Sequence, residues 1–141
     1  MLDVMRTVFD PLRRKDVALT PEEQVRQWCI GVLAEDLGVP LHMMMSEAGF
    51  KLGGKQFRAD ILVYDRNAQP LAVVECKRPE VDLSREVLDQ AIRYNMVLNV
   101  PYIFITNGTR TIVSRRKEQD GRIGYEFMEK APTYNEMLCQ Q

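Results

Sequence analysis

Three residues near the middle of this 141-residue sequence could act together in catalysis: Asp60, Glu75 and Lys77. Glu75 and Lys77 end the run LAVVECK, and because side chains alternate across a β-strand they point to the same face. Asp60 is an acid within the apolar run FRADILVYD, where an unpaired carboxylate would be costly to bury. Two acids and a lysine are groups that can bind a divalent cation and stabilise charge on a phosphate.

A hairpin would bring these residues together. The polar stretch 65–70 between the two apolar runs is typical of a turn, so the runs are expected to pair as antiparallel strands. A turn centred on Asn67 and Ala68 sets Asp60 opposite Glu75, with both side chains on one face. This inferred register turns two isolated polar positions into one predicted cluster.

The predicted cluster has the groups that phosphodiester hydrolysis requires. Asp60 and Glu75 can share a hard cation through oxygen ligands, which leaves coordination positions for water and a phosphate oxygen. A metal ion lowers the pKa of its bound water, and Lys77 beside it could orient the attacking hydroxide or stabilise the transition state. A Glu-x-Lys pair alone more often marks a solvated strand end, so the surrounding elements decide between the two interpretations.

The first of these elements is a helix over residues 20–38, in the stretch TPEEQVRQWCIGVLAEDLG. Thr20 is the expected N-cap, and Glu23 would complete a capping box with it. Apolar residues recur at helical spacing and form a stripe: Val25, Trp28, Cys29, Val32 and Leu33. Glu22 lies at the flank of this stripe, whereas Glu23 is expected to point away from it.

The remaining pattern predicts six strands and a second helix. The expected strands are 43–50, 57–64, 71–76, 102–106, 110–114 and 125–127. The second helix is expected over 84–98, where apolar residues keep the helical period. Because that helix forms a crossover, the strands before and after it should run parallel in the middle of the sheet. We therefore predict an α/β fold with a mixed β-sheet flanked by helices on both faces.

The length and composition fit a single globular domain. We expect an N-terminal arm over 1–19, the folded domain over 20–128 and a C-terminal tail over 129–141. Hydrophobic residues make up 45% and charged residues 28% of the chain, which is ordinary for a soluble protein. No apolar run approaches the roughly 20 residues that a membrane span requires, so no membrane association is expected.

Charge and cysteine content indicate how the chain could bind nucleic acid and which cellular compartment to expect. The formal net charge of −1 gives no overall attraction to a polyanion, so nucleic-acid binding would depend on local patches or on another polypeptide. Arg58, with Lys55 and the basic run 115–117, is a candidate phosphate contact, although basic loops are more often simply solvated. The three scattered cysteines are too few for a disulfide framework, and their odd number fits a reducing cytoplasm.

These motifs together resemble a known nuclease superfamily. Asp60, fourteen intervening residues and the Glu-Cys-Lys of 75–77 look like the PD-(D/E)XK signature, with Ala59 in place of its proline. The stretches TPEEQVRQ, FRADILVYD, VVECKRP, LDQAIRYN and FITNG further resemble the N-terminal nuclease domain of type I restriction enzyme R subunits. This resemblance covers about residues 18–114, which is most of the chain.

The resemblance implies a restriction-endonuclease-like fold and Mg²⁺-dependent hydrolysis of DNA, with Mn²⁺ able to substitute. In that family the Asp and the Glu of the signature bind the metal and the Lys is catalytic, which assigns Asp60, Glu75 and Lys77 here. An acid of the first helix assists, and helical geometry favours Glu22 over Glu23 as this additional metal ligand.

The resemblance also implies a supporting pair and a set of partners. A Gln-x-x-x-Tyr pair lies near the site in that family and falls on Gln90 and Tyr94, which share one edge of the second helix. The implied partners are DNA and the helicase, methyltransferase or specificity subunits of a restriction system. No GK[ST] phosphate loop occurs in this sequence, so it is not expected to translocate on DNA alone.

Two other functions stay open at this point. The chain could be a nuclease-fold module that binds DNA or assembles with restriction or repair partners without useful turnover. It could also be a structural α/β protein whose acids and lysine form a satisfied ion-pair network. The intact set of Asp60, Glu75 and Lys77 favours the nuclease, whereas the small size and the missing motor favour the binding module.

Overall fold

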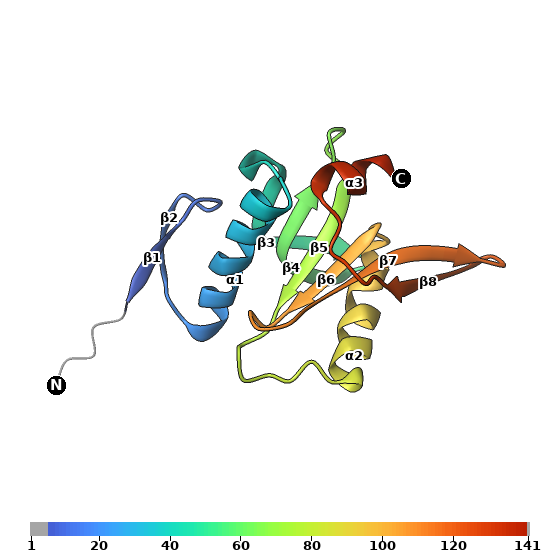
Figure 1. Ribbon diagram of the computed structural model, residues 1–141. Coiled ribbons are helices and arrows are strands. Elements are labelled where there is room, and N and C mark those ends of the chain that lie inside the picture. The colour runs from blue at the N-terminus through green and yellow to red at the C-terminus, as the bar shows by residue number, and fades with distance from the viewer. Residues whose placement is uncertain (1–5, 141) are drawn as a thin grey trace.

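One mixed β-sheet with the strand order β3-β4-β5-β6-β7-β8 dominates the computed structural model, which describes residues 6–140 (Figure 1). Its strands are β3 (Met44–Leu52), β4 (Lys55–Tyr64), β5 (Pro70–Cys76), β6 (Tyr102–Thr106), β7 (Thr111–Gln119) and β8 (Arg122–Phe127). Strands β5 and β6 run parallel and the other neighbouring strands run antiparallel. The predicted α/β class and the predicted parallel pair at the crossover are confirmed.

Helices cover both faces of this sheet. They are α1 (Pro21–Gly31), α2 (Arg85–Asn95) and α3 (Tyr134–Cys139), with a π-helical turn Val32–Asp36 and 3₁₀ turns Leu41–Met43 and Met96–Leu98. Ile61 and Val74 pack in a cluster with α1 and α3, whereas Leu62 and Val73 pack in a cluster with α2. The alternation along the central strands thus gives the sheet two apolar faces, one covered by α1 and α3 and the other by α2. No helix within residues 6–140 is long and apolar enough to cross a membrane.

The central hairpin has the predicted register. Ile61 lies opposite Val74 and Leu62 lies opposite Val73, and the pairing shifts only after Val63, close to the turn. This is the register that sets Asp60 near the end of β5, because Asp60 directly precedes the paired stretch of β4. The apolar alternation on both strands and the turn residues between them are sufficient to specify it.

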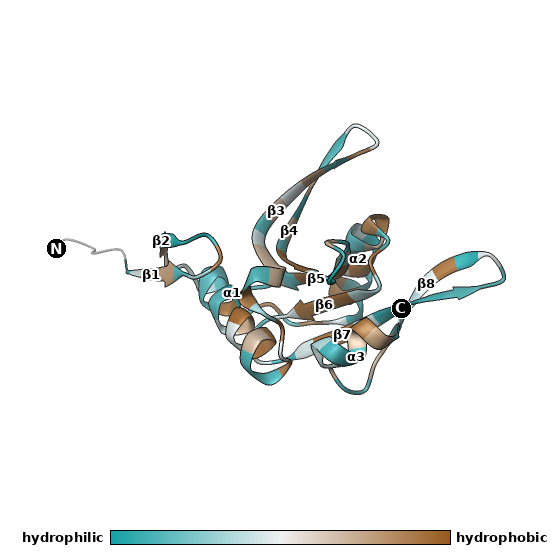
Figure 2. Cartoon of the chain, turned by 90° about the horizontal axis from the view of Figure 1, so that it is seen from above, coloured by the Kyte–Doolittle hydropathy of each residue, from teal (hydrophilic) through white to brown (hydrophobic). Residues whose placement is uncertain are grey.

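The ladder between β3 and β4 is interrupted beside Asp60. Pairing skips Glu47 and resumes with Ala48 opposite Ala59, and Glu47 has a left-handed φ of +51°. Beyond the interruption Ala59 packs with the α2 cluster, although Ile61, two residues further on, packs with the α1 cluster. The outer part of the β3–β4 hairpin therefore turns toward α2 and rises away from the sheet (Figure 2).

Three short elements lie where the sequence predicted none. Strands β1 (Thr7–Asp10) and β2 (Lys15–Ala18) form an antiparallel hairpin within the expected arm 1–19, and α3 lies within the expected tail 129–141. Tyr134 and Met137 of α3 are buried in the α1 cluster, so this part of the tail packs on the sheet. Residues 1–5 of the arm and residue 141 of the tail lie outside the described residues.

Candidate active site

Asp60 is held at the point where β4 leaves the body of the sheet. Its Oδ2 accepts a hydrogen bond from the backbone N–H of Cys76 (2.7 Å), and its Oδ1 accepts one from the guanidinium of Arg26 (3.2 Å). Burial raises the pKa of Asp60 above its ordinary value, and the nearby charge of Glu75 adds to this rise. The Cys76 amide and Arg26 favour the carboxylate but offset the rise only in part. Asp60 and Glu75 are therefore close enough to interact electrostatically.

Glu75 is contacted by Lys77 and Asn95. Its Oε2 lies 2.7 Å from Lys77 Nζ, and its Oε1 accepts a hydrogen bond from the side-chain amide of Asn95 (2.9 Å). Asn95 is buried, and its amide also donates to the carbonyl of Ala91 (2.8 Å), which fixes its orientation on α2. The backbone N–H of Lys77 donates to the carbonyl of Thr106 (2.8 Å), so the chain after β5 stays anchored to β6.

The side chains predicted from the sequence gather around two adjoining clefts. The first has a volume of about 380 Å³ and is lined by six of them: Glu22, Arg58, Asp60, Glu75, Lys77 and Tyr94. The second has a volume of about 310 Å³, and Gln90 lines it together with Glu75, Lys77 and Tyr94. Both acids and the lysine thus face a solvent-accessible hollow that a substrate could enter.

The Gln-x-x-x-Tyr pair lies on the edge of α2 beside these clefts. The hydroxyl of Tyr94 accepts a hydrogen bond from the backbone N–H of Arg58 (3.2 Å). Its ring packs against Phe57, with the ring centroids 5.6 Å apart. Gln90, one turn earlier, is exposed and lines the smaller cleft beside Glu75. Tyr94 therefore joins α2 to the β3–β4 hairpin, while Gln90 stays open to solvent.

Arg26 is a buried cation that contacts four acids. Its guanidinium lies 2.6 Å from Glu23, 3.2 Å from Asp60, 3.4 Å from Glu47 and 3.5 Å from Glu22. Only 4% of Arg26 is exposed, so its contacts with Glu23 and Asp60, which are largely buried, operate away from bulk water. Within the described residues its Nε is the one buried side-chain nitrogen or oxygen without a hydrogen-bond partner. Arg26 thus couples helix α1 to the carboxylate of Asp60.

The network continues from Glu23 into the N-terminal hairpin. Glu23 Oε1 also accepts a hydrogen bond from Arg13 (2.6 Å), and Arg13 in turn pairs with Asp10. Asp10 is fully buried, and its other oxygen accepts the backbone N–H of Leu12 (2.8 Å). Arg13, in the turn after β1, therefore lies two ion pairs away from Arg26, and Asp10 of β1 lies three ion pairs away.

The helix acids differ from the sequence interpretation in one respect. Thr20 is the N-cap as predicted, and its hydroxyl accepts the backbone N–H of Glu23 (3.1 Å). The expectation that Glu23 points away from the packed side of the helix is wrong, because its carboxylate is buried against Arg13 and Arg26. Glu22 is about half exposed and lines the first cleft, so it keeps the position in which it was predicted.

Two residues of this site were missed by sequence reasoning. Asn95 lies on the same face of helix α2 as the buried residues Leu88 and Ala91. A polar residue at a position that the helical period assigns to the core could have revealed it. Arg26 is four residues from Glu22 and three from Glu23, a spacing that predicts a surface ion pair on a helix. Neither spacing alone indicates the contact with Asp60, which depends on tertiary packing.

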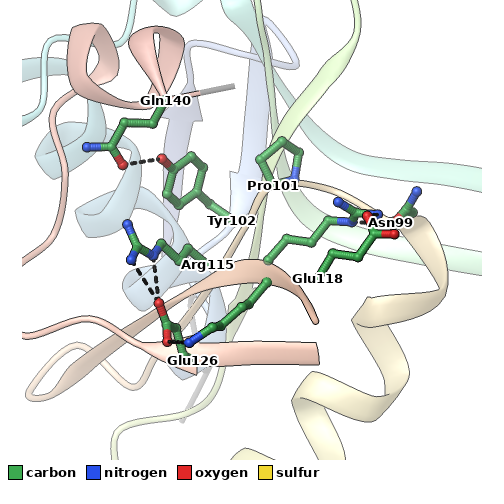
Figure 3. A pocket seen from close by; sticks show the side chains of 9 residues that line it. Asn99, Pro101, Tyr102, Arg115, Glu118, Glu126 and Gln140 are labelled. Carbon is green, nitrogen blue, oxygen red and sulfur yellow. Dashed lines mark hydrogen bonds and ion pairs between the residues drawn. The ribbon is translucent and has the colours of Figure 1, made fainter. Parts of the chain in front are cut away.

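A larger hollow of about 800 Å³ lies near β7, β8 and α3 (Figure 3). Its charged side chains pair with one another: Glu126 contacts both Arg115 (2.8 Å) and Lys117 (3.1 Å). The hydroxyl of Tyr102 donates to the side chain of Gln140 (3.2 Å) at its other side. The predicted site residues line other hollows, so size alone does not locate the candidate site.

The two carboxylates of the cleft suit a small hard cation. Mg²⁺ commonly uses one or two protein carboxylates and completes its shell with water, and Asp60 and Glu75 provide this donor set. Within residues 6–140 no three His, Cys, Asp or Glu side chains are placed together as a metal-binding group. Glu22 pairs with Arg26, so its role as an additional ligand stays a prediction. The residues fit a metal held by two acids.

A mixed sheet with helices on both faces, and two acids and a lysine at the end of its central hairpin, is consistent with the PD-(D/E)XK nuclease class. Within that class, the chain belongs to the family described as the type I restriction enzyme R protein N terminus (HSDR_N), whose model matches residues 21–132. The predicted resemblance is therefore confirmed at the level of the family. The hairpin β1–β2 lies before the matched region.

Individual relatives agree with this family assignment. The chain is 33% identical over 78 residues to the endonuclease subunit of the type I restriction enzyme EcoAI from Escherichia coli, a match that covers 55% of this chain and 9% of that protein. A fragment assigned as an HsdR subunit of a type I restriction enzyme from Vibrio vulnificus YJ016 has the same fold, with a TM-score of 0.60 and 22% identity. That match covers 86% of this chain and 25% of the other.

Proposed function

We propose that this chain is a nuclease module of a restriction system and that it hydrolyses DNA phosphodiester bonds with Mg²⁺, or with Mn²⁺ in its place. The observation that carries this proposal is the arrangement of Asp60, Glu75 and Lys77 around one cleft in a chain of the R-subunit N-terminal family. The lysine ammonium lies 2.7 Å from Glu75, so it could contact a phosphate group bound beside the acids.

Five residues of the cleft have a role in this proposed reaction. A metal ion bound by Asp60 and Glu75 would supply Lewis-acid stabilisation of the phosphate and a more acidic water. Lys77 orients the attacking water or stabilises the added negative charge on phosphorus. The Cys76 amide holds Asp60, and Asn95 holds Glu75, so both carboxylates have a fixed position before the substrate arrives.

The family supports a proposal for the setting of this activity. The relatives are far longer than this chain, and the helicase, methyltransferase or specificity subunits of a restriction system are its proposed partners. The thiols of Cys29, Cys76 and Cys139 are free, which suits the reducing cytoplasm proposed for the protein. DNA is the proposed substrate in that compartment.

A binding module without turnover is the alternative function. The observation that favours it is that both carboxylates already have cationic partners: Arg26 contacts Asp60 and Lys77 contacts Glu75. Such a cluster can be electrostatically satisfied without a metal, and it would then support the fold of a DNA-binding or assembly domain.

A plasmid-nicking assay separates these functions. Supercoiled plasmid is incubated with the wild-type chain and Mg²⁺ or Mn²⁺, next to Asp60→Asn and Lys77→Ala. Matched controls are Asp120→Asn and Lys130→Ala, which make the same changes at exposed positions away from the cleft. We expect metal-dependent nicking by the wild type and both controls and its loss in both cleft variants. A wild type that retards DNA on a gel but never cuts would favour the binding module.

A further inference from the structure

The outer β3–β4 hairpin is an exposed arm beside the proposed site. It closes through Gly53 and Gly54, whose φ values of +55° and +80° suit glycine in a tight turn. Residues 51–56 are all exposed, and the arm rises from the sheet next to α2 (Figure 2). Two-stranded hairpins are marginal alone, but this one is tied to α2 by the contacts of Phe57 and Arg58 with Tyr94.

The charge on this arm is all of one sign. Between residues 48 and 59 the sequence has three cations, Lys51, Lys55 and Arg58, and no acid. None of the three forms an ion pair with another residue of the described range 6–140. Cations that are exposed, clustered and unneutralised are available to an anionic partner.

The other projecting hairpin, β7–β8, shows the opposite pattern. Glu126 pairs with Arg115 and Lys117, at 2.8 Å and 3.1 Å, and Arg116 lies 3.5 Å from Glu118. Its basic run is thus largely neutralised by acids of the same hairpin. The two hairpins extend in different directions from the sheet (Figure 2).

One face of the β3–β4 arm is basic, and its inner end lies at the cleft. Lys51 lies opposite Gln56, so these two side chains share a face, and Arg58 is on the same face two residues from Gln56. Arg58 also lines the cleft that contains Asp60. A row of two cations and an amide therefore leads from the proposed site toward the tip of the arm. Lys55, at the tip, starts on the opposite face of the hairpin, and its long flexible side chain adds a third charge there.

We propose that this basic face, Lys51, Gln56 and Arg58 with Lys55 at the tip, binds the phosphate backbone of a DNA duplex that passes the cleft. This inference rests on the proposed function, which makes DNA the substrate. A chain with a net charge of −1 needs such a local patch, because its overall charge does not attract a polyanion. Contacts of this kind position the duplex for cutting without reading its sequence.

The test is a DNA-binding measurement that does not require cutting. Fluorescence anisotropy of a labelled duplex in EDTA, at several salt concentrations, gives Kd and its salt dependence. We expect the double variant Lys51→Glu/Lys55→Glu to bind roughly tenfold or more weakly, with a log Kd–log salt slope reduced by about 2, because each lost phosphate contact removes about 0.9. Both side chains are exposed, and a thermal melt verifies that the variant is folded.

The matched control is Arg122→Glu/Lys130→Glu, which makes the same charge change at exposed positions on and just after β8. We expect it to bind DNA within about twofold of the wild type, since the charges it changes lie outside the proposed contact. Equal weakening in both double variants would overturn the inference, because it would show a general effect of net charge.

Plasmid nicking separates the inference from the proposed function. If the wild type cuts plasmid and the arm variant binds and cuts DNA as well as the wild type does, the proposed DNA contact of the basic face is wrong and the nuclease proposal stands. If the wild type binds DNA through the arm but never cuts it, the proposed DNA contact is supported and the proposed nuclease activity is wrong. A folded wild type that neither binds nor cuts DNA overturns both.

Discussion

The two carboxylates of the cleft are held by different kinds of contact. Asp60 belongs to a buried network in which Arg26 is 4% exposed and Glu23 is 5% exposed. Glu75 instead faces Lys77, whose side chain is 35% exposed, and one amide donor from α2. The Asp60 side therefore contributes most to stability, whereas on the Glu75 side Asn95 fixes the carboxylate and the more exposed Lys77 is able to change partners when a substrate or a metal binds.

The largest effect on stability is expected at Arg26. Arg26→Met leaves the carboxylates of Glu23 and Asp60 without their shared cation, and breaking a buried ion pair costs about 3–5 kcal/mol. Urea unfolding should show a loss of that order in the free energy of unfolding. Lys77→Met removes a cation from the exposed side and should cost no more than about 1 kcal/mol. Equal losses in the two variants would contradict the difference between the two sides.

Asp10 tests how far the buried network extends. Burial alone would raise its pKa, but the hydrogen bonds from Arg13 and from the Leu12 amide hold the pKa of Asp10 below its ordinary value. Its contribution to stability is therefore present above the unfolded pKa of about 3.9 and is lost as the pH falls through the lower folded pKa. Asp10→Asn should cost about 1.5–3 kcal/mol at pH 7, because it removes a charged hydrogen-bond acceptor.

The pH dependence of unfolding checks this directly. The difference between the wild type and Asp10→Asn should be constant from pH 7 to about pH 5 and should shrink below about pH 4. Asp16→Asn, at an exposed position of β2, is the matched control and should differ little from the wild type at any pH. A difference that persists unchanged at low pH would show that the Asp10 charge is not what stabilises the hairpin.

Asn95 tests the other side of the cleft. Asn95→Leu keeps the volume of a buried side chain but removes the donor to Glu75, so we expect about 1–2 kcal/mol of destabilisation. Because Glu75 loses its fixed position, the nicking rate should fall by roughly tenfold or more while the chain stays folded. An unchanged nicking rate in a nicking-competent chain would mean that Asn95 supports only the fold.

The sequence predicted the central sheet well because the information there is local. The apolar runs, the turn between residues 65 and 70 and the crossover helix define the order and register of β4, β5 and β6. The N-terminal hairpin was missed because its strands have four residues each and Phe9 is 58% exposed, so there is no buried alternation to detect. Helix α3 is only six residues long, which is too short for a helical repeat of apolar residues to be recognised in the sequence.

The placement of the candidate residues around one cleft could be predicted in part for the same reason. Asp60, Glu75 and Lys77 follow from the hairpin register, which the sequence contains. The buried network does not, because it joins Arg13, Arg26 and Glu47, which come from three separate segments of the chain. The spacing of residues along the chain does not indicate contacts between distant segments, and Glu47 by itself looks like an ordinary exposed acid.

The smallest effect is expected at Tyr94, on the exposed edge of the cleft. Tyr94→Phe removes one hydrogen bond to the Arg58 backbone but keeps the packing against Phe57, so the free energy of unfolding should fall by only about 0.5–1 kcal/mol. Tyr94→Ala loses both contacts and frees the β3–β4 arm, and should weaken DNA binding more than Tyr94→Phe does. Urea unfolding and duplex anisotropy measure the two effects. If Tyr94→Phe alone abolished nicking without weakening binding, the hydroxyl would act on the reacting groups and not through the arm.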